Sequence, residues 1–146
     1  MAQQDYTNHR RYVAGFHIVL TTFLLAVFVL AVINLVRCFP AEGSGWLYSG
    51  LLPLLVSISF ILMFVYVRQF PLSVQDRLIL TEENFRHYQL TGKKLDGRLT
   101  KSQIIALRFA PDEEFLPLAT QAADQGMQPD EIKKSIKQWK ADHNRA

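Results

Sequence analysis

Two long runs without a charged side chain constrain the fold of this chain more than any other feature. Residues 18–36 form an apolar run of nineteen residues, and residues 46–67 form one of twenty-two. A helix rises 1.5 Å per residue, so about 20 residues cross a hydrocarbon core of about 30 Å. Backbone groups within lipid must be hydrogen-bonded inside their own segment, which favours a helix. Each run is therefore predicted to be a transmembrane helix.

The first run could also belong to a cleaved signal peptide. Ala41, Glu42 and Gly43 resemble a small-x-small cleavage site. However, the apolar run exceeds the about 7–15 residues that are usual in a signal peptide. Arg37 and Pro40 also separate the run from the site. We therefore expect a membrane anchor that is retained.

The connection between the two runs indicates an antiparallel hairpin. It has only nine residues, 37–45, and is rich in turn-forming residues. A connection this short places two helices side by side, with both ends of the chain in one compartment. Arg10 and Arg11 precede the hairpin and Arg68 follows it, whereas the connection holds only Arg37. The positive-inside rule then predicts that both termini are cytoplasmic.

Small and polar residues within the runs predict where the two helices touch, because small side chains allow close approach. An antiparallel register places Ala26 opposite Ser57 and Asn34 opposite Ser49. The residues predicted to pack the hairpin are Thr22, Ala26, Asn34, Ser49, Gly50 and Ser57.

Charge is concentrated in the second half of the chain. Residues 68–146 carry thirteen of the sixteen Lys and Arg and eleven of the thirteen Asp and Glu, so this half is expected in water. Phe70-Pro71 is predicted to break the second spanning helix, and a new helix is predicted over 74–91, ended by Gly92. Its apolar residues at helical spacing form one face: Val74, Leu78, Phe85 and Tyr88.

The last third of the chain predicts three short helices. Thr100 and Gln103 form a capping box for the first. The second covers 112–125, with three acids at its start and Gly126 at its end. The third begins at Pro129 and carries an apolar stripe through His143. Buried positions are expected in the last two of these helices: Phe115, Leu118, Ala119 and Ala122, then Ile132, Ile136, Trp139 and His143.

The predicted fold class is therefore all-α. A transmembrane helical hairpin is followed by a juxtamembrane amphipathic helix and a small three-helix cytoplasmic cluster. The predicted organisation is an N-terminal cytoplasmic segment 1–17, the hairpin 18–67, the juxtamembrane helix 68–92 and a helical cytoplasmic domain 93–146.

No motif predicts catalysis. Glu83 and His87 are four apart on one helical face, but a metal site needs three or four ligands and no further cluster completes this one. The sequence has a single cysteine, Cys38, and neither a glycine-rich phosphate loop nor a GxSxG motif. We expect no enzymatic activity, no metal and no cofactor.

Basic residues at both ends of the chain predict an interaction surface: His9, Arg10, Arg11, Lys133, Lys134 and Lys137. The lysines suggest two specific hypotheses. Ala122, Gly126 and Ile132 have the spacing of a DNA-binding helix-turn-helix, although acids at 130 and 131 would face the phosphates. A basic helix with a nearby tryptophan could instead lie on an anionic membrane surface. Nucleic acid is the less favoured partner.

Several short motifs lie outside the apolar runs: residues 8–11 (NHRR), 16–17 (FH), 75–77 (QDR), 90–92 (LTG), 98–100 (RLT), 103–110 (QIIALRFA), 112–115 (DEEF), 131–134 (EIKK) and Trp139. In these the chain resembles a family of small bacterial membrane proteins known only as a domain of unknown function. Pro111 departs from the resemblance, because a capping serine is expected there. The resemblance implies two spans in a bacterial inner membrane and lends no activity.

The favoured function is a membrane-anchored interaction or accessory protein, with the lipid bilayer and either a second copy or a larger membrane complex as partners. The alternatives are a membrane-tethered nucleic-acid-binding protein and a small subunit of a transport or respiratory complex.

Overall fold

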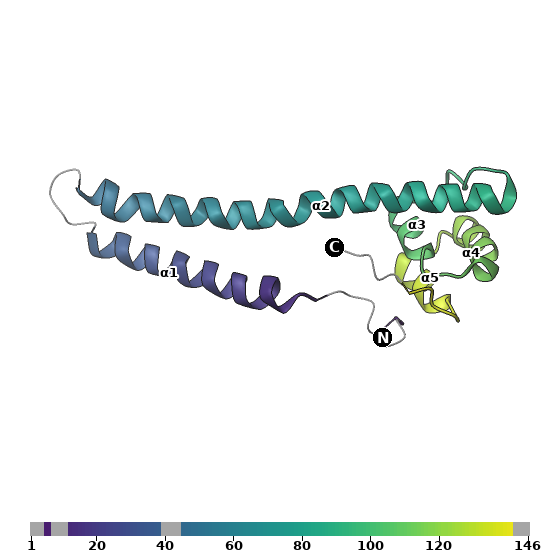
Figure 1. Ribbon diagram of the computed structural model, residues 1–146, viewed down its shortest axis with the longest axis horizontal. Coiled ribbons are helices and arrows are strands. Elements are labelled where there is room, and N and C mark those ends of the chain that lie inside the picture. The colour runs from purple at the N-terminus through teal and green to yellow at the C-terminus, as the bar shows by residue number, and fades with distance from the viewer. Residues whose placement is uncertain (1–4, 7–11, 39–44, 142–146) are drawn as a thin grey trace. The chain divides into compact units, whose positions relative to one another are not determined.

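The computed structural model describes residues 5–6, 12–38 and 45–141, which contain helices and loops and no strand (Figure 1). The all-α prediction is confirmed. The chain divides into two compact units. The hairpin unit is Tyr12–Phe70, and the helical domain consists of Met1–Arg11 together with Pro71–Ala146.

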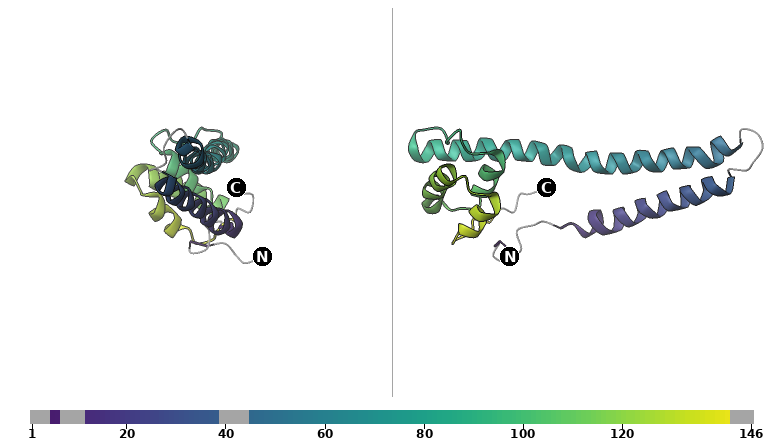
Figure 2. Two further views of the ribbon diagram at one scale, coloured as in Figure 1. Left: turned by 90° about the vertical axis from the view of Figure 1, so that its left-hand side faces the viewer. Right: turned by 180° about the vertical axis from the view of Figure 1, so that it is seen from behind.

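The hairpin unit contains α1 (Thr21–Cys38) and the first part of α2 (Leu52–Thr91), and each helix begins with a π-helical turn. Gly15–Leu20 (η1) leads into α1, and Leu47–Leu51 (η2) leads into α2. Phe16 stacks on Phe64 with ring centroids 4.5 Å apart, and the Asn34 amide donates to the carbonyl of Ser49. These contacts join the two helices at opposite ends, so they run antiparallel and side by side (Figure 2).

The two helical stretches are long and apolar enough to cross a membrane. They cover Gly15–Cys38 and Leu47–Thr91, and only 6% and 11% of the residues in their most apolar windows are buried. A core helix of a water-soluble protein would bury most of such a window. In their low burial, these two stretches therefore differ from the core helix of a water-soluble protein.

Helix α2 continues through Pro71, so the predicted break at Phe70-Pro71 is wrong. Proline removes one backbone donor and crowds the carbonyl four residues earlier, at a cost of about 3 kcal/mol. Each residue on either side of Pro71 adds one helical hydrogen bond, and helix propagation is cooperative. The helix therefore tolerates one local defect and ends where predicted. Gly92 stops it with φ of 70°.

Three short helices follow in the helical domain: α3 (Lys101–Leu107), α4 (Asp112–Gln125) and α5 (Pro129–Ser135). The predicted capping box starts α3, since Gln103 N–H donates to the Thr100 hydroxyl and Thr100 N–H donates to the Gln103 side chain. Gln103 also donates its amide to the carbonyl of Met127 at 2.8 Å, which ties the start of α3 to the turn after α4. That turn uses Gly126, with φ of 62°.

The core of the domain lies among these helices and the loop before them. All four predicted residues of α4 are buried, and Ile132 and Ile136 join them. Trp139 is half-buried against Phe109, with ring centroids 4.8 Å apart. The buried cluster consists of Leu95, Leu99, Ile104, Ala106, Leu107, Phe109, Ala110, Phe115, Leu118, Ala119, Ala122, Met127, Ile132 and Ile136.

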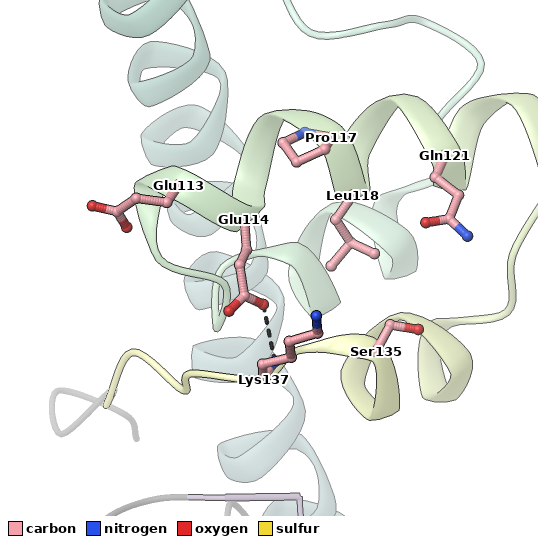
Figure 3. A pocket seen from close by; sticks show the side chains of 7 residues that line it. All are labelled: Glu113, Glu114, Pro117, Leu118, Gln121, Ser135 and Lys137. Atoms are coloured by element: carbon pink, nitrogen blue, oxygen red, sulfur yellow. Dashed lines mark hydrogen bonds between the residues drawn. The ribbon is translucent and has the colours of Figure 1, made fainter.

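Helix α5 ends at Ser135, earlier than the stripe through Trp139 and His143 predicted. The carboxylate of Glu114 accepts the backbone N–H of Lys137 at 2.9 Å (Figure 3). It also accepts the backbone N–H of Gln138 at 3.1 Å. Lys140 N–H donates to the carbonyl of Phe109 at 2.8 Å. Amides held by these partners cannot make the next helical bonds, so the chain turns extended at Ile136. His143 lies outside the described residues.

Candidate interaction surface

Arg86 attaches α2 to the rest of the helical domain. Its side chain is only 11% exposed and makes three polar contacts. It donates to Glu83 at 3.1 Å, to Asp112 at 2.6 Å and to the carbonyl of Ala110 at 2.8 Å. The guanidinium also lies 4.4 Å from the ring centroid of Phe115. One side chain thus joins α2 to the N-terminus of α4 and to the core.

Glu83 is the buried partner of Arg86. It is 6% exposed, and burial raises the pKa of its carboxyl above the ordinary value, while the neighbouring Arg86 opposes that rise. A carboxylate removed from water needs such a cation to remain charged. The pair is therefore structural: it allows a charged face of α2 to pack against the domain.

The predicted ion pairs along α2 differ from those that form. Four-residue spacing with the acid first favours ion pairs of Glu82 with Arg86 and of Glu83 with His87. Arg86 instead pairs with Glu83, three residues before it. His87 Nδ1 lies 2.9 Å from the carbonyl of Lys93 and 3.3 Å from the Thr91 hydroxyl. Arg86 also binds Asp112 and the carbonyl of Ala110, which orient its side chain toward the core. These partners are distant in the sequence, so the spacing of charges along α2 does not predict them.

The described part of the chain contains no group of three or more His, Cys, Asp or Glu placed to hold a metal ion. A hollow of about 380 Å³ beside the Arg86 contacts is lined by charged groups that include Glu83, Asp112 and Lys140. Another, of about 260 Å³, lies between α4 and the end of α5 (Figure 3). Among the acids that line them, Glu83 and Glu114 already accept hydrogen bonds from the protein itself.

The predicted basic surface is only partly described. His9, Arg10 and Arg11 lie outside the described residues. Among the lysines, Lys133 pairs with Asp130 at 3.4 Å, and the Lys134 ammonium lies 5.5 Å from the ring centroid of Tyr6. Lys137 follows the end of α5, and its backbone N–H binds Glu114. The three lysines therefore do not share one helical face.

The apolar face of α2 that the sequence predicts is exposed within the helical domain. Val74, Leu78, Phe85 and Tyr88 are each more than half exposed. The face that packs on the domain instead contains Ile79, Glu83 and Arg86. In Figure 1, α3, α4 and α5 gather on one side of the final turns of α2. The exposed face is thus available to another molecule.

The hairpin packs along a stripe that differs in part from the prediction. Asn34 reaches the Ser49 carbonyl, Ser57 is 2% exposed, and a Cβ added to Gly50 would lie 3.1 Å from Leu35 Cδ1. Thr22 and Ala26, in contrast, are exposed. The less exposed positions of α1 lie along one face: Thr21, Leu24, Phe28, Ala31, Asn34, Leu35 and Cys38. Thr22 and Ala26 share a face, but that face points outward.

This difference gives a test with one substitution at two sites. Ala31 is 5% exposed and Ala26 lies on the outer face, so Ala31→Leu should lower hairpin stability by about 1–3 kcal/mol through overpacking, and Ala26→Leu should not. Resistance of the full chain to unfolding in detergent, followed by circular dichroism, measures both. Equal effects would contradict the observed stripe.

The model of the Family of unknown function (DUF6526) matches residues 1–146. The chain belongs to DUF6526. No curated protein and no solved structure matches it. The resemblance inferred from the sequence to a family of unknown function is therefore confirmed. Membership places the hairpin, the Arg86 contacts and the exposed face of α2 within one DUF6526 region, and it adds no reaction.

Sequence reasoning missed the structural roles of three residues in this DUF6526 chain, Glu83, Arg86 and Glu114. Glu83 and Arg86 are three apart, a spacing that can form an ion pair on a helix. That signal was present, but the four-residue spacing of Glu82 and Arg86 competed with it. Glu114 was noted only as an acid at a helix start. No local pattern shows that it receives the backbone after α5.

Proposed function

We propose that this chain is a membrane-anchored interaction or accessory protein rather than an enzyme. The proposal rests on two mostly unburied apolar helices joined to a helical domain. In that domain, the charged groups that line the hollows bind the protein itself: Glu83 pairs with Arg86, and Glu114 accepts the backbone N–H of Lys137. A hairpin of this kind fixes a small domain at a membrane, and the exposed face of α2 offers a protein contact. The favoured setting is a bacterial inner membrane with both termini in the cytoplasm.

Two features weigh against the nucleic-acid alternative. Helix α5 has seven residues, and Asp130 and Glu131 occupy its first turn. A recognition helix places its N-terminal residues near base edges and phosphates, where these acids would be repelled. The alternative of a small subunit in a transport or respiratory complex fits the same anchor. Purification of the full chain in a mild detergent distinguishes such a subunit from an accessory protein, because a subunit co-purifies with stoichiometric membrane partners.

The proposed topology predicts opposite labelling at two cysteines. In bacterial spheroplasts, a thiol reagent that does not cross membranes should label Cys38, the last residue of the first spanning helix, and should not label a cysteine in a Cys38→Ser/Ala146→Cys variant. Labelling of both variants after lysis is the control for reactivity. The reverse preference would contradict cytoplasmic termini.

A further inference from the structure

Five exposed positions on α2 follow the spacing of a coiled-coil seam. Val74, Leu78, Thr81, Phe85 and Tyr88 are separated by four, three, four and three residues, and all five are exposed. We call these five residues the α2 stripe. A strict repeat of 3.5 residues is the pattern of a helix that packs against another helix, whereas a helix on a flat apolar surface shows a broader face. The stripe therefore fits a helical partner.

The residues beside the α2 stripe determine which helix fits. In heptad positions, Leu78 and Phe85 occupy a, and Val74, Thr81 and Tyr88 occupy d. Arg77 then lies at g and Glu82 at e, on opposite flanks of the seam. In a parallel pair of helices, a g residue faces the e residue five positions later on its partner. Arg77 of one copy would thus meet Glu82 of the other, twice by symmetry.

The same spacing recurs one heptad later. Asn84 at g would face Gln89 at e of the second copy, which joins two amides that can hydrogen-bond. Within the described residues, neither Arg77 nor Glu82 forms an ion pair. An antiparallel pair would place g against g and e against e, so it would bring no Arg77 to Glu82. The flanking charges favour a parallel partner with this same sequence.

We propose that the α2 stripe binds the α2 stripe of a second copy of this chain in a parallel coiled coil. The inference rests on the proposed function in one respect: copies inserted in one membrane with one topology present their helices in parallel. The symmetry is then a rotation about the membrane normal, with the same surface used by each copy. The domain packs through Ile79, Glu83 and Arg86, which leaves the seam free for this contact.

Disulfide cross-linking of the full chain in native membranes tests the contact. In a Cys38→Ser background, identical d residues meet across a parallel seam, so Thr81→Cys should give a cross-linked dimer under mild oxidation. Leu90→Cys is the matched control, because Leu90 is also exposed on α2 but lies outside the seam. We expect about tenfold more cross-linked dimer for Thr81→Cys than for Leu90→Cys, which corresponds to a tenfold difference in the equilibrium constant of the contact.

Charge reversal tests the register. Arg77→Glu and Glu82→Arg should each reduce cross-linking at Thr81→Cys by about fivefold, since each places two like charges together in the dimer. The double reversal restores both pairs and should restore the cross-link. Equal cross-linking at Thr81 and Leu90, or no rescue by the double reversal, overturns the parallel seam. Alkaline extraction of the same membranes is scored separately: a chain released into the soluble fraction contradicts the anchor of the proposed function and leaves the cross-linking result standing.

Discussion

Replacing Arg86 with Met is expected to lower the free energy of unfolding of the helical domain by about 3–5 kcal/mol. The substitution keeps an unbranched apolar stem but removes all three polar contacts of the guanidinium. Glu83 would remain buried without its cation, and removal of one partner of a buried ion pair costs more than the pair contributes. Hydrogen exchange of α4 amides in the full chain in detergent, read by mass spectrometry, measures the loss.

Two variants control for this result. Arg98→Met removes an arginine that also contacts two acids, Asp96 and Asp124, but whose side chain is 60% exposed, so little change is expected. Adding Glu83→Gln to Arg86→Met removes the stranded charge and should recover part of the lost protection. If Arg86→Met exchanged like the wild type, the contact between α2 and the domain would not hold in solution.

Phe115→Ala is expected to cost about 3–5 kcal/mol as well, for a different reason. Phe115 is 0% exposed, and its ring contacts Arg86 on one side and lies 6.2 Å from His87 at its edge. Truncation leaves a cavity in a core with few large residues, so the domain should lose most of its protected amides. A Trp46→Phe background leaves Trp139 as the single tryptophan, and its fluorescence then reports unfolding of the domain alone.

Phe23→Ala is the matched control for Phe115→Ala. Phe23 lies in α1 of the hairpin unit and is 65% exposed, so its truncation removes no core contact from the domain. The Trp139 signal should therefore melt as in the parent. A Phe115→Ala variant with the same melt as Phe23→Ala would show that the core packs without this ring.

Local chemistry made α4 predictable to its bounds. Three acids suit a helix N-terminus, Gly126 provides the left-handed residue that ends a helix, and the intervening apolar residues are spaced for one buried face. The capping box at Thr100 is equally local. The bounds of α4 and the capping box of α3 depend on residues only a few positions apart, so they can be predicted from the sequence alone.

Predictions failed where residues outside the local motif decide the structure. Pro71 carries a strong local signal to stop, but the helix on both sides outweighs one lost hydrogen bond. The apolar stripe after Pro129 favours a longer helix, but Glu114 binds the amides that would extend it. In the hairpin, Ala26 and Ala31 are chemically identical, and only the rotation of α1 separates the exposed residue from the buried one.

The order of the core residues along the chain bears on how fast the domain forms. Every residue of the buried cluster lies between 95 and 136, so all contacts among its helices, including that of α3 with α5 across α4, fall within this one short segment. Chains dominated by such local contacts fold in microseconds to milliseconds, because little loop entropy is lost before the first contacts form. The core is also complete only once Ile136 is available. During synthesis, both long apolar helices are therefore translated before the domain is complete, and the domain can collapse only after Ile136 has followed.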